Sequence, residues 1–467
     1  MIKCLFFKSF DSRGGKRMEK MILNAKDRPK SKLKWFLLSF QHVFAMFGAT
    51  ILVPLLTGLP ISVALFTSGL GTLIYIACTK AKVPVYLGSS FAYIPVISSL
   101  MKTSGLGAVF TGMFFVGVIY CLIALAVRLF GKTWIKKVLP PIIVGPMIMI
   151  IGLGLSTSAI SNAGLVSSIE GVSKVQQWKM ILIALACLLM VALFALKGTK
   201  FMKIIPFLLA IVGGFILSAI FGLIDFSNFV SIIKSPAQWF KIPEFHFLSL
   251  KDATYNVLGT TITFNKVNLV GALPVIPLAF VTACEHIGDH SVLSKITGQD
   301  YLEDPGLDKT LLGDGIATSV AALFGGPANT TYGENTSVVG MTKVASVWVT
   351  GLAAILAILL SFSNVFIALI SAIPACVMGG ISIVLYGFIA SNGLRVLVDS
   401  KIDLTKTRNL IIISSMLVIG LGGAVIALTI NQSMIEISSM AIAAIVGIVL
   451  NAILPCKKES ETPAEEE

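Results

Sequence analysis

The stretch GGPANTTYGENTSVVG, residues 325 to 340, decides the fold of this 467-residue chain. It places a proline, two asparagines, two adjacent threonines and Glu334 inside a sequence that is 56% hydrophobic, with a mean hydropathy of +0.91. A second stretch, VPVYLGSSFAYIP at residues 83 to 95, has the same broken character. In both, glycine and proline precede a helical run, which predicts a short extended segment leading into a half-helix.

The composition around these stretches is that of a membrane protein. Only 13% of the residues are charged, and segments such as 105 to 127 run almost without charge for about 20 residues, the length that crosses about 30 Å of hydrocarbon. The net charge of +13 does not indicate nucleic-acid binding, because much of the positive excess lies in residues 1 to 34, which contain eleven Lys and Arg and three acids. A basic flank ahead of the first apolar segment predicts a cytoplasmic N-terminus.

Apolar stretches separated by short polar segments predict fourteen membrane crossings, seven before and seven after a polar connection. They are expected near 35 to 56, 61 to 79, 83 to 100, 105 to 130, 139 to 158, 178 to 196 and 203 to 224, and near 269 to 292, 310 to 325, 330 to 344, 345 to 362, 366 to 394, 408 to 429 and 434 to 454.

The two sets of crossings match each other internally. Gln41-His42 corresponds to Glu285-His286, and AIVG at 210 to 213 recurs at 444 to 447, in the same order along each half. An odd number of crossings per copy inverts the second copy in the membrane. The fold class is therefore an all-α polytopic membrane protein with a 7+7 inverted repeat, broken in its third and tenth crossings. The expected divisions are a basic cytoplasmic tail at 1–34, the first repeat at 35–224, an extracytoplasmic connection at 225–267, the second repeat at 268–454 and a cytoplasmic C-terminal tail at 455–467.

The two broken crossings are candidates for a binding site. Irregular backbone at membrane depth is tolerated only where it lines a cavity or is covered by protein. In corresponding positions of two inverted repeats, it is the best pointer in a sequence to a substrate site. The backbone N–H groups near Phe91 and Gly333, at the half-helix starts, would be donors there. The alternative is a simple kink or a surface loop.

The stretch AFVTACEHIGDHSVL, residues 279 to 293, carries further chemistry. Glu285 and Asp289 share one helical face, and His286 and His290 share another, because residues four apart stack. A zinc site of the metallopeptidase type is disfavoured, since the order is E-H-x-x-D-H rather than H-E-x-x-H and no third histidine ligand stands out beside His42 and His246. We expect neither a metal nor a cofactor. A ligand-binding, proton-accepting carboxylate is favoured over structural pairing, or over a hydrated position of His290 and Asp289 near the cytoplasmic end.

Together these stretches predict the ligand. Glu285 and Glu334 are expected to meet near the bilayer midplane beside the backbone donors, and a carboxyl group shielded from water can take up a proton near neutral pH. A fitting ligand presents alternating N–H and C=O groups on a planar ring, and it stacks on Phe91, Tyr332 or Tyr386. A nucleobase has that edge, whereas an anion would be repelled by two acids.

Six motifs place the chain close to a known family. They are QHVFAMFGATILVP (41–54), VPVYLGSSFAYI (83–94), CEHIGDH (284–290), DPGL (304–307), PANTTYGENTSV (327–338) and VMGGISIVLYG (377–387). Over about 35–454 the chain resembles the bacterial uracil permeases of the nucleobase/ascorbate transporter family, also called nucleobase-cation symporter 2.

The resemblance implies a core domain of segments 1 to 4 and 8 to 11, and a gate domain of segments 5 to 7 and 12 to 14. It implies a homodimer in the lipid of the cytoplasmic membrane that imports uracil by proton symport with alternating access, and neither an enzyme nor a nucleic-acid-binding protein. Three alternatives stay open. The substrate is xanthine, urate or another nucleobase, the coupling ion is Na⁺, or the chain is an anion transporter or channel of similar architecture.

The resemblance also implies roles for individual residues. Glu285 and Glu334 would hydrogen-bond the base, Phe91 and Gly333 would donate backbone N–H groups, and the ring would pack against Ala49, Tyr332 and Tyr386. Candidates for proton coupling are Glu285, Glu334, Asp289 and His286. Some relatives place a histidine four residues after the first glutamate, where this chain has Asp289. His290 lies about 100° further round the helix, which leaves the proton relay open between these two residues.

Overall fold

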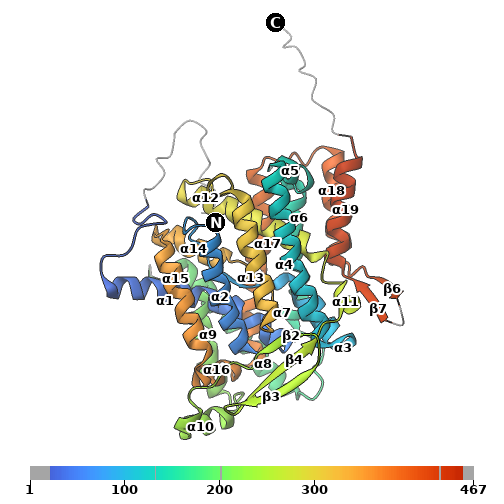
Figure 1. Ribbon diagram of the computed structural model, residues 1–467. Helices are drawn as coiled ribbons and strands as arrows, with labels where there is room; N and C mark the ends of the chain where they lie inside the picture. The colour runs from blue at the N-terminus through green and yellow to red at the C-terminus, as the bar shows by residue number, and fades with distance from the viewer. Residues whose placement is uncertain (1–20, 132, 200–201, 204, 431–432, 456–467) are drawn as a thin grey trace, which may run out of the picture.

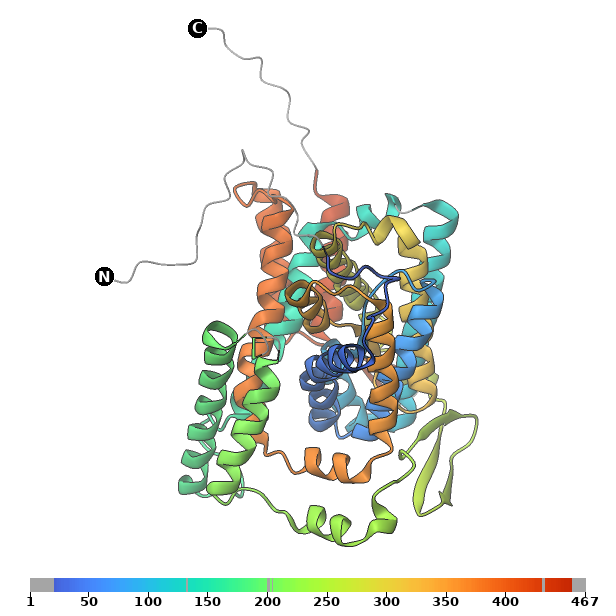
Figure 2. The same cartoon turned by 90° about the vertical axis from the view of Figure 1, so that its left-hand side faces the viewer.

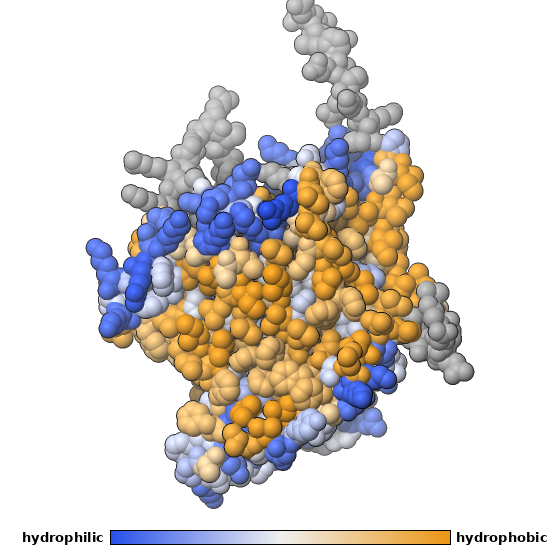
Figure 3. All heavy atoms as spheres, in the orientation of Figure 1, coloured by the Kyte–Doolittle hydropathy of each residue, from blue (hydrophilic) through white to orange (hydrophobic). Residues whose placement is uncertain are grey.

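The computed structural model describes residues 21–131, 133–199, 202–203, 205–430 and 433–455. Helices make up most of it (Figure 1), and apolar side chains form a broad band between two hydrophilic rims (Figure 3). In the described part of the chain, six helices are long and apolar enough to cross a membrane. The polytopic helical architecture is confirmed, and the count of fourteen crossings stays a prediction.

The first half begins with two long helices, a short strand and a broken helix. Its elements are α1 (Lys32–Thr57), α2 (Ile61–Cys78), β1 (Leu87–Ser89), η1 (Phe91–Tyr93), α3 (Ile94–Thr103), α4 (Gly105–Phe130), α5 (Thr133–Val138), α6 (Pro141–Gly154), α7 (Ser156–Asn162), α8 (Lys174–Lys197) and α9 (Pro206–Ile220). Local chemistry sets several boundaries. The Ser31 side chain accepts from the Lys34 N–H and caps α1, which ends at Gly58 in the left-handed conformation. Pro141 and Pro206 begin helices, where a missing N–H costs nothing.

The second half repeats this order. After the connection come α11 (Leu269–Ala272), α12 (Leu278–Thr297), η3 (Leu302–Gly306), α13 (Leu307–Leu323), β5 (Asn329–Thr331), α14 (Gly333–Thr342), α15 (Val347–Ser361), α16 (Asn364–Ser371), α17 (Ala375–Asp399), α18 (Thr407–Leu421), β6 (Ile426–Ile430), β7 (Ser433–Ile437) and α19 (Ser439–Ile453). In both halves, a three-residue strand therefore precedes a short helix at the third crossing.

Packing between the halves confirms the inverted repeat. Helix α4 of the first half packs on α13 of the second, and the equivalent pair with the halves exchanged, α15 and α2, also pack on each other. In the same way, α8 packs on α17, and the equivalent pair is α18 and α6. The two short strands, one from each half, pair antiparallel, with Leu87 opposite Thr331 and Ser89 opposite Asn329. The predicted extended segments of the third and tenth crossings are confirmed by this pair.

The helices form two groups that each draw on both halves. The core group contains α1 to α4 and α12 to α15, and the gate group contains α6, α8, α9 and α17 to α19. Figure 2 shows α8 and α9, in green, on the left and α1 and α2, in blue, toward the right. This interleaving is the division that the resemblance implies. Contacts of α12 with α6 and α19, and of α1 with α9, join the groups.

Strands also occur outside the third and tenth crossings, where the all-α prediction had none, and two crossings are divided differently. Residues 225–267, expected as a connection, hold α10 (Ser227–Lys234), η2 (Pro236–Gln238) and a three-stranded sheet in the order β2 (His246–Ser249), β4 (Thr260–Lys266) and β3 (Ala253–Val257). The crossing expected at 366–394 is two helices, because Pro374 supplies no N–H to continue α16 and instead precedes α17. The crossing expected at 408–429 ends as a helix at Leu421, beside Gly422 and Gly423, and the hairpin of β6 and β7 follows.

Candidate functional site

Helix α12 presents two chemically different faces. Glu285, Asp289 and Val292 line a cavity, whereas His286 and His290 are fully buried on the other side of the helix. This division is the one that the spacing of four residues predicts. The helix therefore joins a polar cavity wall to the packed interior of the core group.

The paired strands β1 and β5 hold the two half-helix starts in place. The Ser90 N–H donates to the Ala328 carbonyl at 2.9 Å, and the Tyr332 N–H donates to the Tyr86 carbonyl at 3.1 Å. The next residues are Phe91, the first of η1, and Gly333, the first of α14. Both predicted donors therefore stand where helical N–H groups lack partners within the helix.

The ring of Tyr332 lies so close to the opposite strand that position 88 there must be glycine. A Cβ added to Gly88 would lie 2.4 Å from the Tyr332 ring, so only glycine fits there. The Tyr332 hydroxyl donates to the Ser89 carbonyl and accepts from the Thr50 hydroxyl, both at 3.0 Å. With both hydrogen-bonding functions of its hydroxyl used, the tyrosine offers the cavity a fixed aromatic surface.

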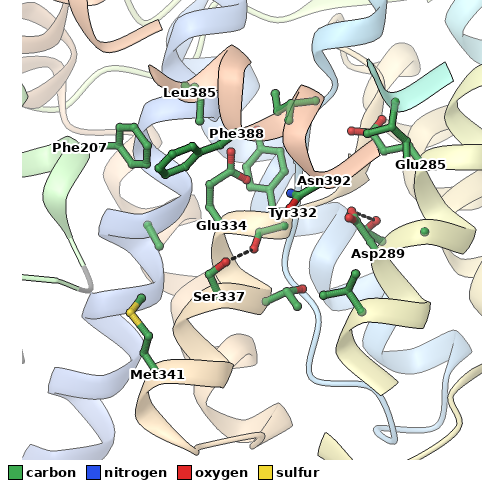
Figure 4. A pocket seen from close by; sticks show the side chains of 18 of the residues that line it. Phe207, Glu285, Asp289, Tyr332, Glu334, Ser337, Met341, Leu385, Phe388 and Asn392 are labelled. Carbon is green, nitrogen blue, oxygen red and sulfur yellow. Dashed lines mark hydrogen bonds between the residues drawn. The ribbon is translucent and has the colours of Figure 1, made fainter. Parts of the chain in front are cut away.

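The cavity has a volume of about 370 Å³ and lies between the two helix groups. Figure 4 shows Glu285, Asp289, Tyr332 and Glu334 on the core side, with Phe388 on the gate side. Further lining residues from α1, α6, α9, α14 and α17 are Phe44, Ile148, Phe207, Ser337, Leu385 and Asn392. A pocket of this size suits a small ligand.

Three half-buried carboxyl groups face this cavity: Glu285, Asp289 and Glu334. The Thr330 hydroxyl donates to Glu285 Oε2 at 3.4 Å, and the Thr331 hydroxyl donates to Asp289 Oδ2 at 2.7 Å. Both glutamates come from the second repeat; at the position matching Glu285 the first repeat has Gln41. Three acids in a space of low dielectric repel an anionic ligand and favour a ligand that donates hydrogen bonds.

Basic residues lie at one end of the cavity. Lys203, between α8 and α9, and Arg395, near the end of α17, belong to its lining. So do Ile296, near the end of α12, and Met341, near the end of α14. The cavity thus reaches from the half-helix starts toward the face at which α12, α14 and α17 end.

The structure places one predicted ring contact, Tyr386, differently. Tyr386 packs edge-on against Phe91, with ring centroids 5.6 Å apart, and it stands behind Phe91 rather than on the cavity wall. Its hydroxyl finds no partner among the described residues. Phe388, one half-turn further along α17, lines the cavity instead. The contact predicted for Ala49 falls outside the described side chains.

His286 is buried away from the cavity. Its Nδ1 lies 2.8 Å from Asp314 Oδ2, and its ring stacks on His290 with centroids 4.1 Å apart. His290 Nε2 lies 2.5 Å from the Tyr75 hydroxyl. The alternative of a hydrated His290 does not hold, because this side chain is fully buried. Within the described residues, no group of three or more His, Cys, Asp or Glu side chains could hold a metal ion.

Sequence reasoning missed two kinds of cavity residue. Thr330 and Thr331 hold the acids in place, and Asn392 is a polar residue that the gate group contributes. The signal for Asn392 was an amide within an apolar helix, since polar groups at membrane depth are rarely incidental. No signal in the sequence pairs each threonine with its acid, because this depends on how β5 crosses α12.

Comparison with known proteins agrees over nearly the whole chain. The model of the Permease family matches residues 33–429. A uracil permease of Bacillus subtilis (strain 168) is 44% identical over 452 residues, which cover 96% of this chain and 99% of the relative. A uracil permease of Bacillus caldolyticus is 45% identical over 443 residues, which cover 95% of this chain and 97% of the relative.

A solved structure shares the architecture. Murine Solute Carrier 26 family member A9, described as an anion transporter in the inward-facing state, matches with a TM-score of 0.63 and 12% identity, over 91% of this chain and 68% of that chain. At this identity the likeness lies in the fold alone, so the ligand must be argued from the cavity.

Proposed function

This chain belongs to the Permease family, and on that premise we propose that it imports uracil across the cytoplasmic membrane by proton symport. Membership makes it a membrane transporter rather than an enzyme. The names of its relatives support uracil as the substrate. Its apolar band supports direct contact with lipid, and the resemblance supports a homodimer.

One observation carries the proposal: carboxyl acceptors and half-helix donors line the same cavity. Glu285 and Glu334 supply acceptors for the N–H groups of the base, and the amides at Phe91 and Gly333 supply donors for its carbonyl oxygens. The rings of Phe91 and Tyr332 offer stacking surfaces. A neutral, planar pyrimidine satisfies all of these groups, and leaving a buried one unpaired would cost about 1–3 kcal/mol.

The coupling proton is assigned to the acids of the cavity wall, Glu285, Glu334 and Asp289. Protonation of one of them reduces the repulsion among three carboxylates and accompanies binding of the neutral base. His286, the fourth candidate, has no access to the cavity in this state; any part that it plays runs through Asp314 and the interior of α12. Na⁺ as the coupling ion is the alternative that the experiment separates.

Alternating access is assigned to movement of the core group against the gate group. The cavity extends toward Lys203 and Arg395, residues of loops and helix ends that positive-inside counting places on the cytoplasmic side. This arrangement corresponds to a state open to the cytoplasm. In the opposite state, the same acids would face the side of β2 to β4.

Uptake into proteoliposomes tests the proposal. Labelled uracil should accumulate when the interior is alkaline, and accumulation should stop when a proton ionophore collapses the gradient. A Na⁺ gradient without a pH gradient should give no accumulation. Accumulation that follows Na⁺ alone would replace the proton in this scheme.

Competition defines the substrate class. Unlabelled uracil should displace the label, whereas equal concentrations of xanthine and urate should displace little. Strong inhibition by xanthine would assign the chain to the purine carriers of the same fold. Sulfate binding without pyrimidine binding would assign it to anion transport.

A further inference from the structure

A segment ahead of the first membrane helix is built into the core group. Residues 22–28, called here the N-terminal strap, run parallel to the connection between α14 and α15. The Ile22 N–H donates to the Lys343 carbonyl at 2.8 Å, the Ala345 N–H donates to the Leu23 carbonyl at 2.8 Å, and the Val347 N–H donates to the Ala25 carbonyl at 2.9 Å. The strap thus adds a strand-like edge to this connection.

Side chains reinforce the backbone pairing. The Arg28 guanidinium lies 4.2 Å from the Trp35 ring centroid and 5.7 Å from that of Trp348. The Trp348 indole N–H donates to the Lys26 carbonyl at 3.2 Å, and the Ser346 hydroxyl donates to the Asp27 carbonyl at 2.5 Å. The cation against both aromatic rings, together with the two hydrogen bonds, fixes the strap in one position.

The strap begins where the two acid-bearing helices end. Met21, directly ahead of it, packs against a buried apolar cluster that includes Leu293 of α12, Val339 of α14 and Ala345 of the connection. Helix α14 is only ten residues long, carries Glu334 in its first turn and ends at Lys343 in the left-handed conformation. Its start is held by β5 and its end by the strap.

We propose that the N-terminal strap is a positioning element that sets the orientation of α14, and thereby places Glu334 in the substrate cavity. A helix of ten residues has little stability of its own, so its direction depends on what holds its ends. Release of the strap leaves the carbonyl of Lys343 and the N–H groups of Ala345 and Val347 without these partners. The effect on uracil rests on the proposed function; the effect on α14 does not.

Val347 allows a selective test. It is the first residue of α15, and Ser346 before it is extended, with φ −94° and ψ 124°. Proline suits both the first helical position and an extended preceding residue. In the full-length protein, Val347→Pro therefore removes the N–H that donates to Ala25 without interrupting α15. Val347→Ala removes similar side-chain packing, keeps that N–H and serves as the matched control.

Hydrogen–deuterium exchange and uracil binding are then measured on the same preparations in nanodiscs. In V347P, exchange of the α14 amides at 333–342 should accelerate and uracil binding should weaken about fivefold or more, in line with losing a backbone bond that holds the strap. The maximal transport rate should change less than the half-saturation concentration. V347A should match the wild type in exchange and stay within about twofold of it in binding.

The outcomes separate the two proposals. If the α14 amides of V347P exchange at the wild-type rate, the positioning role is overturned. It is also overturned if these amides exchange faster while uracil binds with wild-type affinity. If the wild type itself binds no uracil, the proposed function fails, and the exchange data still decide whether the strap holds α14. A second variant, Arg28→Ala with Ser346→Ala, removes side-chain contacts of the strap and leaves Val347 intact. It should reproduce the faster exchange; exchange at the wild-type rate there counts against the strap.

Discussion

His286 Nδ1 lies 2.8 Å from Asp314 Oδ2, on a side of α12 that does not line the cavity of Glu285. Both side chains are excluded from solvent, and Asp314 Oδ1 and His286 Nε2 have no other partner among the described residues. Helix α12 therefore carries Glu285, which faces the cavity, and directly after it His286, whose contact with Asp314 ties α12 to α13 and is called here the anchor. The anchor fixes the rotation of α12 about its axis, and this rotation turns Glu285 and Asp289 toward the cavity.

Removing the anchor should destabilise the protein. Asp314→Ala leaves the His286 imidazole without its partner in the interior, which should cost about 1–3 kcal/mol. The thermal unfolding midpoint in detergent should fall clearly. Glu170→Ala, at an exposed loop acid, should leave it in place. An unchanged midpoint for Asp314→Ala would mean that the pair contributes nothing to stability.

Neutralising either glutamate of the cavity should abolish efficient transport. Glu285→Gln and Glu334→Gln replace an acceptor-only group by an amide that can also donate, and each should weaken uracil binding by about 10- to 100-fold. Titration calorimetry on the purified protein measures this directly. Glu170→Gln is the control, since Glu170 is exposed and remote from the cavity lining. Wild-type affinity in both cavity variants would remove these acids from the site.

A methyl group at the start of α14 should block the ligand without disturbing the fold. A Cβ on Gly333 would lie 3.7 Å from Asp289 Oδ1 and 3.9 Å from Asn392 Nδ2, which is ordinary van der Waals contact. Gly333→Ala should therefore keep the wild-type unfolding midpoint and lose uracil binding by at least about tenfold, because the methyl group occupies the approach to the backbone donor. If both quantities stay unchanged, the base does not approach this amide.

Asn392 should contribute to affinity from the gate side. Asn392→Ala removes an amide on the wall opposite the acids, and we expect uracil binding to weaken about three- to tenfold. Ser391→Ala is the matched control, since the Ser391 hydroxyl donates to the Gly387 carbonyl within its own helix. Half-saturation concentrations for uptake measure both variants. Equal values for the two would exclude contact between Asn392 and the substrate.

The sequence alone identified the acids and their helical faces. Glu285 and Asp289 share a face because the helix repeats every 3.6 residues, and the structure places both on the cavity wall. Glycine, proline and threonine likewise predicted extended segments within 83–95 and 325–338, because these residues disfavour a continuous helix, and the structure has strands there at 87–89 and 329–331.

The tertiary structure decided what lies opposite those residues. Whether Tyr386 or Phe388 reaches the cavity depends on the rotation of α17, which follows from its packing on α6 and α8. The burial of His286 against Asp314, and the pairing of 22–28 with the connection after α14, join residues far apart in the chain. Local periodicity determines the face on which a side chain lies, whereas contacts between distant elements determine what that face meets. Sequence therefore specified the chemistry of this site, and packing specified its geometry.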